Sequence, residues 1–339
     1  MLKSVYNKNL KNTILDFFIS SKYWKEGNIM NRVSKILNIK YPIIQGPMAW
    51  ITSPELVAAV SNAGGLGTLG TSAGSDEIIT RIEETVEAMR GAIRKTRELT
   101  DKPFGVNVFP KAIDPYGFSS SVVEMLKEEN VMILVVAGIV DKDELLKWKN
   151  EGFTIIFREA NPTVRGAIEA EKAGVDIIVA TGCDEGGSMP NLSTGTTAAT
   201  ALLCDAVNIP VLDAGGIVNE KMARAAQVVG AEGVLVGTRF ILSDECRAAN
   251  VVKEDILNTH PDDYIVFTQS NGFSKWRTTP NKLGKEGLEA NKNGDLNPPS
   301  GSFYYGMLKG DLDAGVNTVS NLSSLIKKID SCEDIVLEL

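Results

Sequence analysis

Two glycine-bearing segments, DAGGIV and VGTRF, have the residue types that bind phosphate. Gly215 and Gly216 follow one predicted strand, and Gly237 and Thr238 follow the next. Glycine leaves backbone N–H groups accessible, and threonine adds a hydroxyl. Three or four charge-assisted bonds of ~1.5–3 kcal/mol each would supply much of the ~8 kcal/mol of a micromolar ligand. The spacing therefore predicts a phosphate site, with a pair of purely structural turns as the alternative.

A third glycine group has the G-x-G-x-x-G spacing of a dinucleotide loop, at Gly65, Gly67 and Gly70 in the stretch AGGLGTLG. That fingerprint follows a strand and opens a helix. Here the glycines follow a predicted helix over 53–63 and themselves form a predicted strand. We therefore interpret Gly64 and Gly65 as a left-handed helix cap. Gly67 and Gly70 would let the strand bend or let a ligand approach its end.

The longest glycine-bearing loop, TGCDEGGSMPNLSTGTT at 181–197, has the length and polarity of an active-site loop. Asp184 and Glu185 are adjacent, so their side chains point apart, and we interpret them as solvated charges rather than as an acid–base pair. Cys183 lacks a neighbouring base and an electropositive setting, so we interpret it as a bystander.

Short apolar runs alternate with amphipathic helical segments between Tyr41 and Phe240. The predicted strands are 42–46, 65–70, 104–109, 131–137, 153–157, 175–180, 209–214 and 232–237. Nearly continuous apolar strands indicate a parallel sheet covered on both faces, and eight β-α units favour a closed (β/α)8 TIM barrel, an α/β fold. A doubly wound sheet is the alternative. In such a barrel the loops after strands 7 and 8 bind phosphate, which agrees with the glycine segments.

The pattern divides the chain into three parts. We predict that residues 1–29 form an amphipathic N-terminal extension that lacks the features of a signal peptide. We predict that residues 30–250 form the barrel. Residues 251–339 predict a polar and helical C-terminal segment packing on the barrel mouth. Within it 258–302 is polar and turn-rich, and 310–329 predicts a helix at its end.

Composition excludes several classes of function. A net charge of -8 excludes a nucleic-acid surface, which needs clustered basic residues. The longest apolar run, 131–140, is half of a membrane span. Four cysteines without paired spacing predict neither zinc nor disulfides and fit the cytoplasm, and His260, the single histidine, predicts a loop or cap residue rather than a metal ligand.

Six motifs occur in the order and spacing of a known family: QGPMAW (45–50), NAGGLGTLG (62–70), KPFGVNVF (102–109), GCDEGGS (182–188), AGGI (214–217) and VGTRF (236–240). From about Met30 to Arg247 the chain resembles the class I nitronate monooxygenase family, which also contains the flavin-type enoyl-acyl carrier protein reductase.

The resemblance implies a barrel that binds FMN at its mouth. Met48 and Ala49 would touch the isoalloxazine ring, Asn107 would bond its polar edge, and Thr181 would face it. The implied cofactor residues are Met48, Ala49, Asn107, Thr181, Gly187, Gly215, Gly216, Gly237 and Thr238, with the last four at the phosphate. The resemblance further implies NAD(P)H as a transient reductant and a small-molecule or acyl-thioester substrate. An acyl carrier protein and a second copy of the chain are further candidate partners.

One departure from the family pattern bears on the chemistry. Relatives read Ala-Gly-Gly-His where this chain has Glu185 to Ser188, and that histidine is the proposed base in nitronate oxidation. Thr181 stands where relatives often carry a carboxylate or carboxamide. Because a serine hydroxyl does not accept a proton near neutral pH, Ser188 holds the catalytic position with its role open. Hydride transfer needs no protein base, since the flavin carries it.

We therefore expect NAD(P)H-dependent flavin reduction followed by electron transfer to an enoyl thioester or a related acceptor. Oxidation of alkyl nitronates with oxygen is the first alternative. A non-redox barrel that binds phosphate esters is the second, with Asp213 as its obvious catalytic candidate, and a flavin protein without catalysis is the third. The electron acceptor and the choice of nicotinamide stay open at this point.

Overall fold

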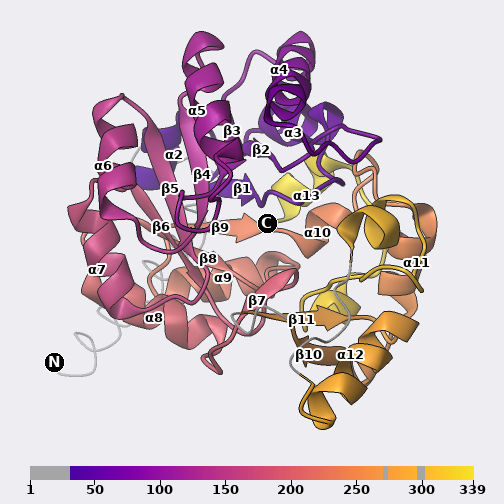
Figure 1. The fold of residues 1–339 in the computed structure, drawn as a ribbon. Helices are drawn as coiled ribbons and strands as arrows, with labels where there is room; N and C mark the ends of the chain where they lie inside the picture. The colour runs from indigo at the N-terminus through magenta and orange to yellow at the C-terminus, as the bar shows by residue number, and fades with distance from the viewer. Residues whose placement is uncertain (1–30, 270–273, 296–301) are drawn as a thin grey trace, which may run out of the picture.

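The computed structural model describes residues 31–269, 274–295 and 302–339. The predicted N-terminal extension, 1–29, lies outside these residues. Figure 1 shows strands gathered at the centre of one lobe with helices around them, and a C-terminal part on one side. No helix in the described ranges is both long and apolar enough to cross a membrane.

Eight parallel strands of the described chain form one sheet in the order β1-β9-β8-β6-β5-β4-β3-β2. Their bounds are β1 Ile43–Gln45, β2 Gly67–Leu69, β3 Phe104–Val108, β4 Ile133–Gly138, β5 Thr154–Glu159, β6 Ile177–Thr181, β8 Val211–Ala214 and β9 Gly233–Val236. A parallel bridge between Ile44 and Leu66 joins the two ends of this order. The predicted TIM barrel is therefore confirmed, and the doubly wound alternative is wrong because the sheet closes on itself.

Apolar side chains from alternate strand positions fill the barrel. Ile44, Val135, Ile156 and Leu212 are buried together in this inner cluster. The first described helix, α2 (Arg32–Leu37), adds Val33 and Leu37 to it. Asn31 donates to Glu232 O, just before β9, so this helix covers the amino ends of the strands. The opposite, carboxyl end stays available for a site.

The helices from α3 to α9 follow barrel strands and lie around the outside of the barrel (Figure 1). They are α3 Pro54–Asn62, α4 Ile82–Leu99, α5 Phe118–Glu128, α6 Lys142–Asn150, α7 Val164–Lys172, α8 Thr196–Ala206 and α9 Glu220–Val228. The helical elements after the last barrel strand are α10 Thr238–Ile241, α11 Asn250–Asn258, η1 Pro261–Asp263, α12 Lys282–Lys292, η2 Tyr304–Leu308, η3 Ser323–Leu325 and α13 Cys332–Glu338. Capping residues define several starts: the Ser53 side chain accepts a bond from Leu56 N ahead of Pro54, as N-caps do.

The glycines of AGGLGTLG make room for backbone rather than for a ligand. Gly64 has φ +101 just after α3, which confirms the left-handed cap. A Cβ at Gly67 would lie 2.2 Å from Val57 O, and one at Gly70 would lie 2.9 Å from Met48 O. The expectation of a ligand approaching Gly67 is therefore wrong, because the backbone of α3 occupies that space.

A second, antiparallel sheet lies beside the barrel, in the order β10-β11-β7. It contains β10 Ile265–Thr268, β11 Ser274–Thr278 and β7 Ser188–Pro190. Much of the segment 258–302, expected to be turn-rich, is thus helix α12 and two strands, and β7 lies inside the predicted loop. The sequence pattern did not predict these strands, because they are short and β7 pairs with a strand distant in sequence.

The predicted helix at the end of 310–329 is wrong. That stretch holds only the short 3-10 turn η3, and the helix that follows is α13, from Cys332 to Glu338. Ser331 caps α13 by accepting a bond from Asp334 N, which fixes where the helix begins.

Candidate active site

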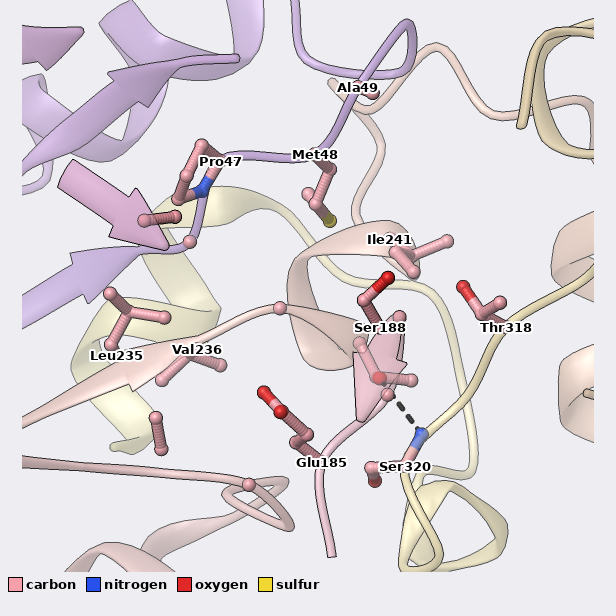
Figure 2. Close-up of a pocket in the computed structure, with 18 of the residues that line it drawn as sticks. Pro47, Met48, Ala49, Glu185, Ser188, Leu235, Val236, Ile241, Thr318 and Ser320 are labelled. Atoms are coloured by element: carbon pink, nitrogen blue, oxygen red, sulfur yellow. Dashed lines mark hydrogen bonds between the residues drawn. The ribbon is translucent and has the colours of Figure 1, made fainter. Parts of the chain in front are cut away.

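A cavity of about 300 Å³ lies at the carboxyl ends of the barrel strands. Segments after β1, β8 and β9 form part of its wall, and Phe303, Met307, Thr318 and Ser320 of the C-terminal part form another. Figure 2 shows Met48, Glu185, Ser188 and Ile241 around this space. The cavity thus lies between the barrel and its C-terminal cover, and this is the position that active sites take in TIM barrels.

The structure brings nearly all the predicted site residues to this one cavity. The predicted residues that line it are Met48, Ala49, Asn107, Gly187, Ser188, Gly215, Gly216, Gly237 and Thr238. Thr181 does not line it: the side chain is buried at the end of β6, and its hydroxyl has no hydrogen-bond partner among the described residues. A buried hydroxyl without a partner is costly, so the position is unusual for a purely structural residue.

The glycines after β8 and β9 differ in what surrounds them. Gly215 and Gly216 have φ +125 and +78, a conformation that favours glycine. A Cβ at Gly237 or at Gly187 would meet no atom within 4 Å. The protein therefore does not require glycine at 237 for its own packing, and the space beside it is part of the cavity.

Glu185 is a cavity-lining residue whose position the sequence interpretation missed. The side chain lines the cavity and the residue is 8% exposed, so the prediction of a solvated charge is wrong for it. Burial raises the pKa of this carboxyl to about 7, against the opposing effect of Arg158, whose guanidinium bonds it directly. Arg158 comes from β5, and its Nη2 also donates to Ser188 O at 3.0 Å.

Asp184 points the other way, as adjacency predicted. Its Oδ2 accepts from Thr196 N at 2.6 Å at the start of α8, and its Oδ1 accepts from Asn321 Nδ2 at 2.6 Å. Asp184 therefore ties the loop to a helix and to the C-terminal part, while Glu185 is left to face the cavity. One sequence signal could have identified Glu185: it is a carboxylate, next to two glycines, at the position where the family pattern has alanine.

The C-terminal sheet holds the loop that carries Glu185. Arg277 of β11 donates to Glu185 O at 2.8 Å and to Cys183 O at 2.7 Å. The Ser188 hydroxyl accepts from Trp276 Nε1 at 3.3 Å and from Gln269 Nε2 at 3.2 Å. Residues distant in sequence, most of them on β11, therefore hold the loop on both sides of Glu185.

Three other sequence candidates lie apart from the cavity wall. Asp213 is buried with its Oδ2 accepting from Thr200 Oγ1 of α8, and burial raises its pKa to about 6. His260 is exposed and caps η1, as a cap residue was predicted to. The Cys183 thiol lies 3.9 Å from Ser193 O. A lyase built on Asp213 is not supported, because its carboxyl packs under a helix.

A barrel with such a cavity at the carboxyl ends of its strands has the arrangement of a TIM-barrel enzyme. The sequence model of the nitronate monooxygenase family matches residues 30–339. The chain belongs to this family and is a flavin-dependent oxidoreductase of it.

Individual relatives agree with that placement. A probable nitronate monooxygenase of Staphylococcus saprophyticus is 33% identical over 279 residues, which cover 70% of this chain and 75% of that protein. A (3aS,4S,5R,7aS)-5-hydroxy-7a-methyl-1-oxo-octahydro-1H-indene-4-carboxyl-CoA dehydrogenase of Rhodococcus jostii is 29% identical over 90% of this chain and 93% of its own.

Solved structures share the fold. FabK from Thermotoga maritima is similar with a TM-score of 0.80 and 30% identity, covering 92% of this chain and 95% of FabK. Nitroalkane oxidase from Streptomyces ansochromogenes has a TM-score of 0.70 and 21% identity, covering 91% and 96% of the two chains. The expected family is thereby confirmed.

Proposed function

We propose that the protein binds FMN in this cavity, takes electrons from NAD(P)H, and passes them to an enoyl thioester or a related acceptor. The observation that carries the proposal is the cavity itself. Its wall joins the glycines after β8 and β9 to the segment of Met48 and Ala49 and to Asn107, across the carboxyl end of one barrel. FMN, when bound, supplies the hydride chemistry that no side chain can perform.

The residues fit the phosphate end of FMN. Gly237 leaves space that a side chain would fill, and Gly215 and Gly216 turn the backbone toward the cavity in a conformation that suits glycine. The Thr238 hydroxyl, which accepts from Ser320 N at 3.1 Å, can donate its own hydrogen to a phosphate oxygen. We assign these four residues to phosphate binding.

Another part of the cavity wall fits a planar ring with a polar edge. Met48 and Ala49 supply apolar contact, and Asn107 presents an amide. The Asn107 Nδ2 donates to Val135 O at 2.9 Å, which orients the amide and leaves Oδ1 as an acceptor for a ring N–H. We assign Met48, Ala49 and Asn107 to the ring, and we retain Thr181 and Gly187 as further contacts.

The proposal for the electron acceptor rests on the similarity to relatives and on the chemistry of Ser188. The structural relative FabK and the carboxyl-CoA dehydrogenase of Rhodococcus jostii both favour an acyl thioester. Coenzyme A and acyl carrier protein are the two carriers of such a group. Oxidation of alkyl nitronates is the second candidate, because the Staphylococcus saprophyticus relative has that name. Ser188 disfavours it, since a serine hydroxyl cannot replace an imidazole base.

The test begins with a visible absorption spectrum of the purified protein, before and after incubation with FMN. We expect a flavin spectrum, bleaching by NADH or NADPH in stopped flow, and reoxidation by an enoyl thioester such as crotonyl-CoA. A protein that stays colourless with excess FMN would contradict the cofactor assignment. Bleaching without reoxidation by any acceptor would instead favour a flavin protein without catalysis.

The remaining assignments are proposals with simpler tests. We propose residues 30–250 as the cofactor-binding barrel and 251–339 as its cover, with 1–29 as an appendage that can be removed without loss of FMN binding. We further propose that the protein works in the cytoplasm and that it assembles as a homodimer. Fractionation of cells would check the first of these, and sedimentation of the purified protein the second.

A further inference from the structure

We propose that Glu185 is the proton donor to the acceptor. The inference rests on the proposed function and names the group that supplies the proton in that reaction. Glu185 faces the cavity from the loop after β6 (Figure 2), and Arg158 of β5 holds its carboxyl from one side.

The cavity wall contains few ionisable side chains among the described residues. Among the described residues that line the cavity, Arg158 and Glu185 are the two with ionisable side chains. A guanidinium keeps its proton at any pH an enzyme meets. Glu185 is therefore the wall residue, within the described chain, that can both hold and release a proton near neutrality.

The surroundings of Glu185 suit a group that alternates between two protonation states. Burial favours the neutral acid, and Arg158 favours the carboxylate, so both forms are accessible at physiological pH. Arg277, which bonds the backbone carbonyl of Glu185, is the other charged group that acts on the carboxyl. Asp184 directs its own oxygens to Thr196 N and Asn321, away from it.

The Arg158 guanidinium connects the carboxyl to position 188. The same Nη2 that bonds Glu185 donates to Ser188 O, so the two positions belong to one hydrogen-bonded cluster. The Ser188 hydroxyl accepts from Trp276 Nε1 and Gln269 Nε2, and a serine hydroxyl does not ionise near neutral pH. Proton exchange at this end of the cavity is thus left to the carboxyl of Glu185.

Reduction of an enoyl thioester adds a hydride to the β-carbon, with both electrons supplied by the reduced flavin, and adds a proton to the α-carbon. The O–H bond of Glu185 breaks as the α C–H bond forms. The resulting carboxylate pairs with Arg158 and regains its proton from solvent before the next turnover. No further oxidant or reductant is needed.

The experiment separates the two half-reactions of the holoenzyme. In Glu185→Gln, reduction of FMN by nicotinamide should proceed at the wild-type rate, because it needs no proton donor. Reoxidation by crotonyl-CoA should slow about 100-fold, within the range for loss of a general acid. Glu159→Gln is the matched control, since burial raises the pKa of that carboxyl too while it bonds Thr163 outside the cavity wall. It should leave both rates unchanged.

The pH dependence gives a second readout. Because the acid form donates, the reoxidation rate should fall as pH rises through about 7. In Arg158→Gln the carboxylate loses its cation, the pKa of Glu185 rises, and the fall should move to higher pH. In heavy water, wild type should place deuterium on one face of the α-carbon, and Glu185→Gln should lose that preference.

A readout without cofactor completes the test. NMR of the protein labelled at its glutamate carboxyl carbons should show one resonance titrating near pH 7, absent in Glu185→Gln. If FMN binds and is reduced normally but Glu185→Gln reoxidises like wild type with the same pH profile, the inference is wrong while the proposed function stands. If no FMN binds at all, the proposed function fails and the inference fails with it.

Discussion

Adding a negative charge at Gly237 tests where the cofactor phosphate lies. A Cβ at this position would meet no atom within 4 Å and its φ is -106, so Gly237→Asp fits the fold without strain. The new carboxylate would face the bound phosphate directly. Two unit charges 4 Å apart repel by about 4 kcal/mol at an effective dielectric of about 20. Halving this for solvent leaves about 2 kcal/mol, or about 30-fold in affinity.

The assay compares FMN with riboflavin, which lacks the phosphate. Quenching of flavin fluorescence on titration with apoprotein gives both dissociation constants. FMN affinity should fall about 30-fold in Gly237→Asp, and riboflavin affinity should change less than about twofold. Gly91→Asp is the matched control, because a Cβ there also meets nothing within 4 Å but lies on α4, and it should change neither constant. An equal loss for both ligands, or no loss for FMN, would refute the phosphate assignment.

Three further predictions concern other parts of the molecule. Gly67→Ala should lower stability by about 1–3 kcal/mol, because its Cβ would lie 2.2 Å from Val57 O, and a lowered denaturant midpoint would show this. Burial raises the pKa of Asp330, but the bonds from Lys328 and Arg239 have the larger effect and hold this pKa below its usual value. The contribution of the Asp330 carboxylate to folding stability should therefore be lost as pH falls through the folded-state pKa. Asp330→Asn should cost about 3 kcal/mol at neutral pH and flatten that acid dependence in urea titrations. Ser188→His should raise oxidation of a simple alkyl nitronate at least ~10-fold, whereas high activity with Ser188 in place would contradict our argument about the base.

The barrel could be predicted because its signals are local. Each strand is a short apolar run between helices, and the glycines at 215, 216 and 237 are recognisable by their place after the last two strands. Asn107 and Met48 needed the family resemblance, since a lone amide or methionine has no specific pattern.

Glu185 could not be predicted because its environment is assembled from distant parts. Its burial depends on Arg158, 27 positions earlier, and on Arg277, 92 positions later. When the positions of these two arginines are unknown, a charged residue in a glycine-rich loop is predicted to be exposed to solvent. The strand at Ser188–Pro190 was missed for the same reason, since it pairs only with β11.

The pairing of Ser188 with Trp276 has a consequence for the order of folding. It joins residues 88 positions apart, and loop closure of that length delays contacts relative to the local β-α units. On a ribosome the barrel strands would emerge complete well before β11 does. The glycines that we propose for the phosphate would therefore be in place while the loop carrying Glu185 still lacked its anchor, so a nascent chain would form its proposed phosphate site before it completed the cavity.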